Sequence, residues 1–239
     1  MQRGFTLLEL SFVLVIIGLL AGTIMAGESV MHHSYLRRVG TEYERYHRAA
    51  LAFHDQYLAY PGDMSNANSF WPSAVPGNGN GLIDEAGAAA STGEVYEYWR
   101  QLAFAGLVEG SYSGRSGPNA AVDSQPDINV PPSRYNGAGW SVHSMPSYFA
   151  GDGWHAAGDY GTYYAFGTDS PGQTEGGALT PLDIYDIDKK YDDGKPMTGK
   201  ITVTNWPQCT NAANVTATGA DYQLTSLVKA CGADFLQLF

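Results

Sequence analysis

The chain has 239 residues, of which 44% are hydrophobic and 15% are charged, and its formal net charge at pH 7 is −11. This length is sufficient for one large domain or two small ones with a hydrophobic core, and the composition suits an ordered, loop-rich extracellular fold better than a disordered acidic chain. Binding to a nucleic acid backbone requires the opposite sign of charge, so no nucleic acid partner is expected.

Residues 3–22, RGFTLLELSFVLVIIGLLAG, form an apolar run that is interrupted by one carboxylate, that of Glu9. Residues 5–26 are long enough to cross the hydrocarbon of a bilayer as a helix. A cleaved signal peptide has an uninterrupted apolar centre and a small-x-small cleavage site, which this segment lacks. A plain membrane anchor would leave Glu9 without a role, although a charge inside a membrane is costly and marks a function.

The stretch RGFTLLEL resembles the processing site of type IV prepilins and of the pseudopilins of type II secretion. The resemblance implies that a prepilin peptidase removes residues 1–4 as a leader by cutting after Gly4, so that Phe5 becomes a methylated N-terminus. It also implies that Glu9 meets the N-terminal charge of a neighbouring subunit during assembly. Two opposite charges close together in a low dielectric offset much of each other's desolvation, which would explain the carboxylate.

Gly18 and Gly22 form a small-xxx-small pair that lets two helices approach closely. Many members of the resembled family carry a proline farther along this helix, where it partly melts in the filament, whereas this chain has glycines there. Helix packing and local melting are therefore both open, and packing is the simpler interpretation.

Beyond the membrane segment, apolar residues recur at alternating spacings of four and three from Val39 to Tyr57, which predicts one apolar stripe on a helix. Two i,i+4 ion pairs are expected on the more solvent-exposed faces of this helix: Arg38 with Glu42, and Glu44 with Arg48. Four histidines are expected on its surface: His32, His33, His47 and His54. Because Pro61 and Gly62 end the pattern, we expect a helical stem over residues 5–58 and a head over residues 59–239.

The head is predicted to contain short helices, short strands and long loops. Helices are expected within 91–110, starting at a capping box of Ser91 and Glu94 and ending near Gly110, within 180–194 after a cap at Thr180, and over 222–230. Strands are expected at 139–145, 160–167 and 200–206. The fold class is therefore α+β, and the resemblance implies the pilin architecture, a long helical stem packed on a head with a small antiparallel sheet.

Cys209 and Cys231 lie close together near the end of the sequence. In an exported chain such a pair predicts a disulfide, which is worth about 3 kcal/mol for a loop of roughly 20 residues. The alternative is two reduced and buried thiols.

Residues 76–87, PGNGNGLIDEAG, are the first candidate for a calcium site. On a twelve-residue calcium loop, Asn78, Asn80 and Asp84 fall at ligand positions, but the first and last positions lack carboxylates. The carboxylates that are candidates to complete a shell are those of Asp63, Glu85 and Glu94. The resemblance supports calcium, since related pseudopilins use it to order head loops; the alternative is a turn rich in Gly and Asn.

A second candidate for calcium is the turn that carries Asp192 and Asp193, where the alternative is a capped helix followed by a turn. Asp152, His155 and Asp159 offer too few ligands for a transition-metal site, so we expect a polar loop there. No enzyme signature is present, and we expect neither catalysis nor a cofactor other than calcium.

These features predict a structural subunit of a type IV filament that polymerises through its N-terminal helix. The expected partners are copies of the chain or other pilins, the prepilin peptidase, an inner-membrane assembly platform, and the membrane before assembly. The chain would leave the bacterial inner membrane for a pilus at the cell surface or for a periplasmic pseudopilus. The alternatives are a minor or tip pseudopilin of a type II secretion system, or a membrane-tethered adhesin whose aromatic clusters near Trp140, Trp154 and Tyr163-Tyr164 bind a ligand.

Overall fold

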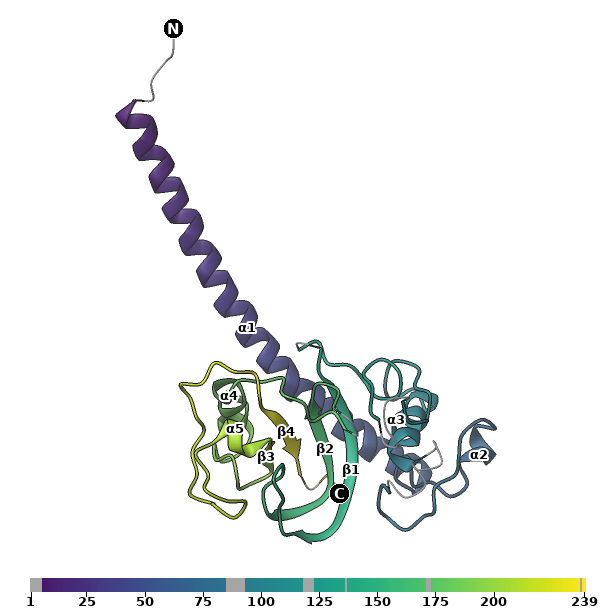
Figure 1. Ribbon diagram of the computed structural model, residues 1–239. Coiled ribbons are helices and arrows are strands. Elements are labelled where there is room, and N and C mark those ends of the chain that lie inside the picture. Colours follow the sequence, from purple (N-terminus) through teal and green to yellow (C-terminus); the bar gives the residue numbers. More distant parts are fainter. Residues whose placement is uncertain (1–5, 85–92, 118–122, 136, 171–172, 237) are drawn as a thin grey trace.

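The computed structural model describes residues 6–84, 93–117, 123–135, 137–170, 173–236 and 238–239. A long stem helix projects from a head that is built on a four-stranded antiparallel sheet, with short helices around it (Figure 1). This is the α+β architecture expected from the sequence.

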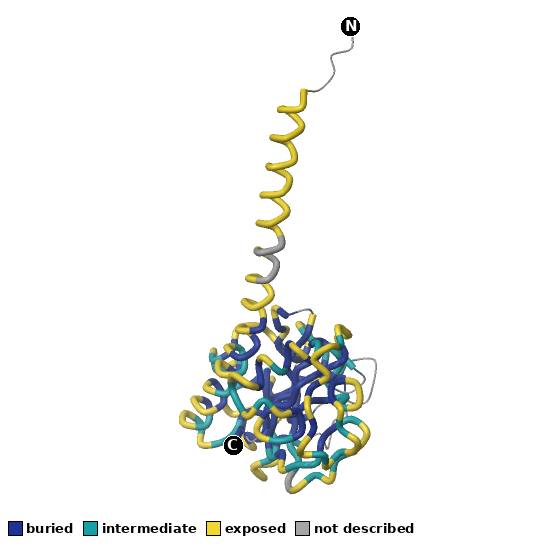
Figure 2. The backbone as a smooth tube through the Cα atoms, turned by 90° about the vertical axis from the view of Figure 1, so that its left-hand side faces the viewer, coloured by how far each residue is buried: buried dark blue, intermediate teal, exposed yellow. Residues whose placement is uncertain are grey.

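The stem is one continuous helix, α1, from Leu7 to Tyr57, close to the predicted bounds. It begins at Thr6, whose side chain accepts a hydrogen bond from the backbone of Glu9, and it ends at Leu58, which adopts a left-handed conformation with φ of 55°. Figure 2 shows that the outer half of the helix is exposed and that the head encloses only its second half.

The predicted apolar stripe of α1 packs on one face of the sheet. Val39, Tyr46, Ala50 and Phe53 of this stripe are buried in the main core. Aromatic rings meet across the interface: Tyr43 stacks on Phe235 at 4.7 Å, and Tyr46 meets Trp140 edge to face at 5.9 Å. Burial of these rings makes the head and the second half of the stem one packed body.

The sheet has the strand order β1, β2, β4, β3, and all of its neighbours are antiparallel. Its strands are β1 (Gly139–Phe149), β2 (Gly158–Gly167), β3 (Ile201–Thr204) and β4 (Gly232–Phe235). Three of them coincide with the predicted strands. The inner strand β4 was not predicted because four residues, GADF, carry no readable alternation.

The shorter helices are α2 (Ala67–Phe70), α3 (Glu94–Phe104), α4 (Pro181–Tyr191) and α5 (Trp206–Cys209). Helix α4 begins at the predicted cap, Thr180, which exchanges hydrogen bonds with Asp183 in a capping box, with proline in the first turn. Helix α3 was predicted to end near Gly110 but ends at Phe104, because Gly106 adopts a φ of 70° that terminates it. Ser91, its predicted cap, lies outside the described residues, and Gly93 is the N-cap.

The predicted helix over residues 222–230 is wrong. Tyr222 instead forms a bridge with Thr210, and the N–H of Gln223 donates to the carbonyl of Cys209. The predicted disulfide between Cys209 and Cys231 is confirmed, with the Cα atoms 5.6 Å apart. These tertiary links at both ends hold the segment in turns and override its local helical pattern.

Candidate functional site

The outer half of α1 is an apolar surface with no partner within the described part of the chain. Leu7–Ile24 is long and apolar enough to cross a membrane, and it packs on no other described element (Figure 2). The exposed apolar side chains in this half are Leu7, Leu8, Leu10, Phe12, Val13, Leu14, Val15, Ile16, Ile17, Leu19, Leu20 and Ile24. Such a surface needs either lipid or other helices to cover it.

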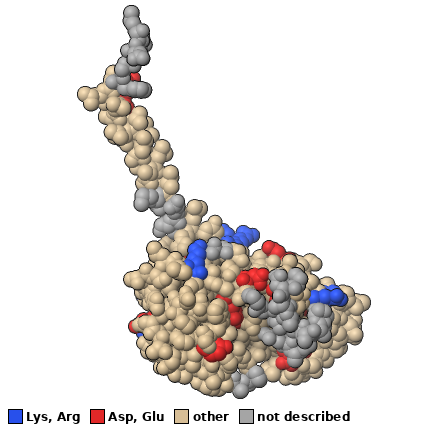
Figure 3. Space-filling model, in the orientation of Figure 1, with Lys and Arg blue, Asp and Glu red and all other residues tan. Residues whose placement is uncertain are grey.

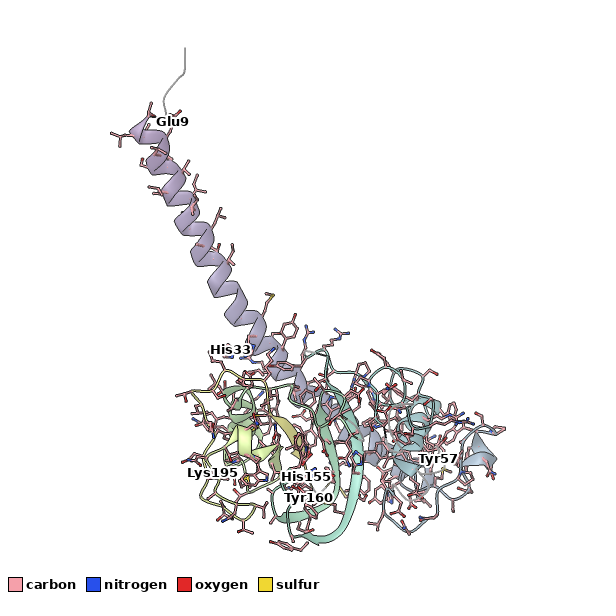
Figure 4. All side chains as sticks on the ribbon, in the orientation of Figure 1. Glu9, His33, Tyr57, His155, Tyr160 and Lys195 are labelled. Carbon is pink, nitrogen blue, oxygen red and sulfur yellow. A yellow bond between two sulfur atoms is a disulfide. The ribbon has the colours of Figure 1, made fainter. Side chains whose placement is uncertain are left out.

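Glu9 stands at the tip of this surface, far from the head (Figure 4). Its carboxylate Oε2 accepts hydrogen bonds from the backbone N–H of Thr6 at 2.8 Å and from the Thr6 hydroxyl at 2.9 Å. Glu9 thus completes a capping box at the start of the stem. This local role was not anticipated, and it means that helix capping and subunit assembly must be separated experimentally. Gly4 and Phe5 lie outside the described residues.

Gly18 and Gly22 lie on the exposed part of α1, where a Cβ added to either glycine would meet, apart from its chain neighbours and the nearby backbone of its own helix, no described atom within 4 Å. The fold of one copy therefore does not require glycine at these two positions. Close approach of a second helix is a reason for glycine that remains a prediction.

Glu42 fastens the stem to the head. Its Oε2 accepts hydrogen bonds from the hydroxyl of Ser133 at 2.6 Å and from Nε1 of Trp140 at 2.9 Å, and its Oε1 accepts from the backbone N–H of Arg134 at 3.3 Å. The predicted Arg38–Glu42 pair is therefore wrong, because the head supplies three donors to this carboxylate. The predicted Glu44–Arg48 pair is confirmed, with 3.7 Å between Arg48 Nη2 and Glu44 Oε2.

A second polar contact fastens the stem nearer its apolar half. Nε2 of His32 lies 2.7 Å from Oδ1 of Asp183, whose Oδ2 accepts a hydrogen bond from the hydroxyl of Tyr135. His32 lies on the helix surface as expected, with its side chain 47% exposed, and its ring also contacts Asp183 of α4. Burial opposes ionisation of Asp183, but hydrogen bonds from Thr180, Tyr135 and His32 outweigh it and lower the pKa of this carboxyl.

The first predicted calcium loop brings its polar side chains together. The side-chain amides of Asn78 and Asn80 both donate to Oδ2 of Asp84, each at 2.8 Å. Asp63 accepts hydrogen bonds from three backbone N–H groups of the loop, between Gly79 and Gly81. These bonds explain the turn without an ion, and the calcium prediction stays untested. Glu85 lies outside the described residues.

Glu94 accepts hydrogen bonds from the backbone N–H groups of Asn78 and Asp84, at 2.8 and 2.9 Å. Burial raises the pKa of this carboxyl. Glu94 and Asp63 therefore fix the loop from the head side, and a cation would have to share these carboxylates with the backbone.

In the second predicted site, oxygens of Asp188, Asp192 and Asp193 lie within 4.8 Å of one another, the spacing that a metal ion requires. The backbone N–H groups of Lys200 and Ile201 donate to Asp192, and the N–H of Lys195 and the hydroxyl of Thr198 donate to Asp193. These carboxylates already stabilise the turn after α4, so calcium stays a prediction here too.

A buried polar cluster covers the face of the sheet opposite the stem. Nε2 of His155 lies 3.0 Å from Oε1 of Glu175, and Nδ1 lies 3.4 Å from Asp152. Figure 4 marks His155 in the head, close to Tyr160. Burial alone would lower the pKa of His155, but the hydrogen bond to Glu175 and the charges of Asp234, Glu175 and Asp152 raise it to about 10. Of the expected polar loop, Asp152 and Asp159 are exposed and only His155 is buried.

Asp234 of β4 belongs to the same cluster. It is fully buried, and neither carboxylate oxygen has a hydrogen-bond partner among the described residues. Burial raises its pKa well above the usual range, an effect that the charge of His155 opposes and those of Glu175 and Asp152 reinforce. Sequence spacing could not reveal this cluster, because β4 and β2 bring Asp234 to it from the far end of the chain.

The prokaryotic N-terminal methylation motif matches residues 1–25. No curated protein and no solved structure matches the chain. The chain therefore carries a prepilin-type segment of the kind found in type IV pilins and pseudopilins. Together with the exposed apolar helix, this segment fits a membrane-anchored precursor that is then assembled into a surface pilus or a pseudopilus.

Proposed function

We propose that this protein is a structural subunit of a type IV filament. In this proposal a prepilin peptidase cuts after Gly4, the N-terminus at Phe5 is methylated, and an inner-membrane platform assembles the stems into a filament. The observation that carries the proposal is that the methylation motif lies on the exposed apolar segment Leu7–Ile24, in which Glu9 is the single carboxylate. Copies of this helix would cover one another's apolar surfaces when they leave the lipid.

The capping geometry is compatible with a second role for Glu9. Among the contacts of the described residues, both hydrogen bonds from Thr6 end on Oε2, so Oε1 is available to the ammonium group of a neighbouring Phe5. That contact would set the axial register between subunits, because in a low dielectric an unpaired charge is costly and a paired one is not.

The Glu9→Gln variant tests the proposal, because glutamine also completes a capping box but carries no charge. We expect Glu9→Gln to insert in the membrane and to be processed, yet to form no filaments that electron microscopy detects. The matched control is Thr6→Ala, which removes the cap and keeps the charge, and we expect it to form filaments. Filaments of Glu9→Gln at the wild-type number would contradict the proposal.

The structure bears on the adhesin alternative, since Trp140, Tyr163 and Tyr164 are fully buried core residues that offer no binding surface. Trp154, the other aromatic residue named for it, is half-buried. A minor or tip pseudopilin is the alternative that the motif equally allows. The two kinds of subunit differ in their abundance in the filament and in the compartment that holds it.

A further inference from the structure

The head carries a group of exposed aliphatic side chains on the side from which the stem projects. Leu227 and Val228 lie in the turns before β4 and are 86% and 62% exposed, and Leu182 in the first turn of α4 is exposed as well. We call these three residues together with Lys229 the stem-side face. Aliphatic side chains that gather at one place on a surface mark a site of interaction with a partner.

Helix α4 runs beside the stem and places Leu182 at the height of His32. At the start of α4, Oδ1 of Asp183 lies 2.7 Å from Nε2 of His32. At its end, Tyr191 packs on Gly40 of the stem. The two helices therefore run in the same direction, and the N-terminal end of α4, where Leu182 lies, is the end nearer the apolar half of the stem.

The segment before β4 meets the same end of α4. Leu179, which precedes α4, forms an antiparallel bridge with Cys231, so the residues just before Cys231 run past the start of the helix. Nζ of Lys229 lies 6.0 Å from the centre of the Tyr135 ring, and the hydroxyl of Tyr135 donates to Asp183. Figure 1 shows this segment, in yellow, passing over α4 on the side from which the stem projects. The residues of the stem-side face are therefore gathered around the N-terminal end of α4.

The length of the stem sets the height of this face above a membrane. When Leu7–Ile24 spans the bilayer, His32 follows the end of the span by eight residues, or about 12 Å of helix. The polar layer of a bilayer is roughly 5–8 Å thick on each side, so the start of α4 lies a few ångström above it. A stem tilt of about 20°, which is ordinary for a membrane helix, lowers a point about 10 Å from the stem axis by about 3 Å. The exposed side chains of the stem-side face then reach the lipid headgroups.

The stem between the span and the head continues the apolar surface, since Val30 and Met31 are exposed. Lipid is therefore the partner that the chain itself brings next to the stem-side face.

Basic side chains accompany the aliphatic ones. Arg37, Arg38 and Lys229 are exposed, and among the described residues no carboxylate forms an ion pair with them. Helix side chains point towards the N-terminus, which brings the two guanidinium groups nearer the membrane. The exposed Asp186 lies among these groups and lines a small cavity with Arg37 and Lys190. Figure 3 shows Lys and Arg side chains beside the point where the stem enters the head. In a chain whose net charge is −11, this local excess of positive charge favours an anionic surface.

We propose that the stem-side face docks on an anionic phospholipid bilayer while the chain is a membrane-anchored precursor. Its aliphatic side chains enter the headgroup layer, and the basic side chains around it face the lipid phosphates. The spanning stem keeps the head at the bilayer surface, so the docking is intramolecular and a few weak contacts suffice to orient the head. The inference concerns the precursor and needs no polymerisation.

Fluorescence quenching in proteoliposomes of phosphatidylethanolamine and phosphatidylglycerol tests the inference with the full-length chain. Because both native cysteines form the disulfide, one introduced cysteine takes a fluorophore. Leu227→Cys reports on the face, and the matched control is Leu58→Cys, a leucine of similar exposure just beyond the far end of the stem helix. A nitroxide on the headgroup of a minor lipid should quench about half or more of the emission at position 227 and almost none at position 58. Equal quenching at the two positions would overturn the inference.

A charge change separates docking from mere proximity. With the label at position 227, Leu182→Glu/Val228→Glu should remove most of the quenching, because the added carboxylates are repelled by anionic headgroups. The fold accommodates both changes, since Leu182 lies in the first turn of α4 and Val228 is exposed. The control Leu51→Glu/Leu58→Glu adds the same charge at exposed leucines far from the membrane and should leave the quenching unchanged. Melting temperatures in detergent report the folding of each variant, and quenching that survives the first pair of changes in a folded chain refutes the docking.

Another copy of the chain is the rival occupant of this face. If the label at position 227 is unquenched in vesicles but shielded in sheared filaments, the face is a contact between subunits and the inference falls. Glu9→Gln separates this inference from the proposed function. We expect it to keep the wild-type quenching at position 227 while it forms no filaments, so either proposal can fail without the other.

Discussion

Glu42 gives the sharpest test of how the stem is joined to the head. Replacing it by alanine leaves Nε1 of the fully buried Trp140 and the hydroxyl of Ser133 without their acceptor. A hydrogen bond to a charged group contributes about 1.5–3 kcal/mol, so the loss of these two bonds should lower the free energy of unfolding by about 3 kcal/mol or more. At about 2–4 °C for each kcal/mol in a chain of this size, Tm should fall by about 6–12 °C.

Thermal unfolding of the detergent-solubilised chain, followed by far-UV circular dichroism, measures this effect. The control is Glu44→Ala, two residues away. Among the described residues Glu44 forms one ion pair, an exposed one with Arg48, which contributes about 0.5 kcal/mol or less. Glu42→Gln keeps one acceptor oxygen and should fall between the two. The reasoning is refuted if Glu42→Ala lowers Tm by no more than Glu44→Ala does.

Three further predictions concern the head. Burial, reinforced by repulsion from Asp193 and Asp192, raises the pKa of Asp188 to about 7 from 3.8, so its contribution to stability should be lost as pH rises from about 4 to 7. Thermal melts across that pH range should show that the Asp188→Asn variant does not lose stability in this way. If the variant shows the same pH dependence as the wild type, the raised pKa is not that of Asp188. Cys209→Ser should lower the free energy of unfolding by about 3 kcal/mol in denaturant titrations, and reduction of the wild type should match it. If the first loop binds calcium, calorimetric titration should detect binding that Asp84→Ala abolishes, and no heat from the wild type would end that proposal.

Local patterns were enough to predict the stem and the N-terminal cap of α4. The stripe from Val39 to Tyr57 and the box of Thr180 and Asp183 depend on residues three or four positions apart, which the sequence displays directly. The pairing of Cys209 with Cys231 followed from there being only two cysteines. The motif around Glu9 is also a short continuous stretch, so it could be recognised from the sequence alone.

Contacts between segments that are far apart in the sequence could not be predicted from local patterns. Glu42 was paired with Arg38 because its partner Trp140 comes from β1, far along the chain. The contact between the surface-exposed His32 and Asp183 was missed because α4 is equally distant in sequence. The buried cluster around His155 includes a residue of β4, and this strand is too short to be recognised from its sequence. In each case a polar side chain acquired its role from tertiary packing and not from its sequence neighbours.

The central claim is that this chain is processed and polymerised through its N-terminal helix. Mass spectrometry of filaments sheared from the producing cells, paired with electron microscopy of the same fraction, tests it most directly. The account predicts filaments that contain this chain, with an N-terminus at Phe5 that carries one added methyl group. A chain that keeps residues 1–4 and stays in the inner membrane while the cells assemble filaments without it would contradict the account.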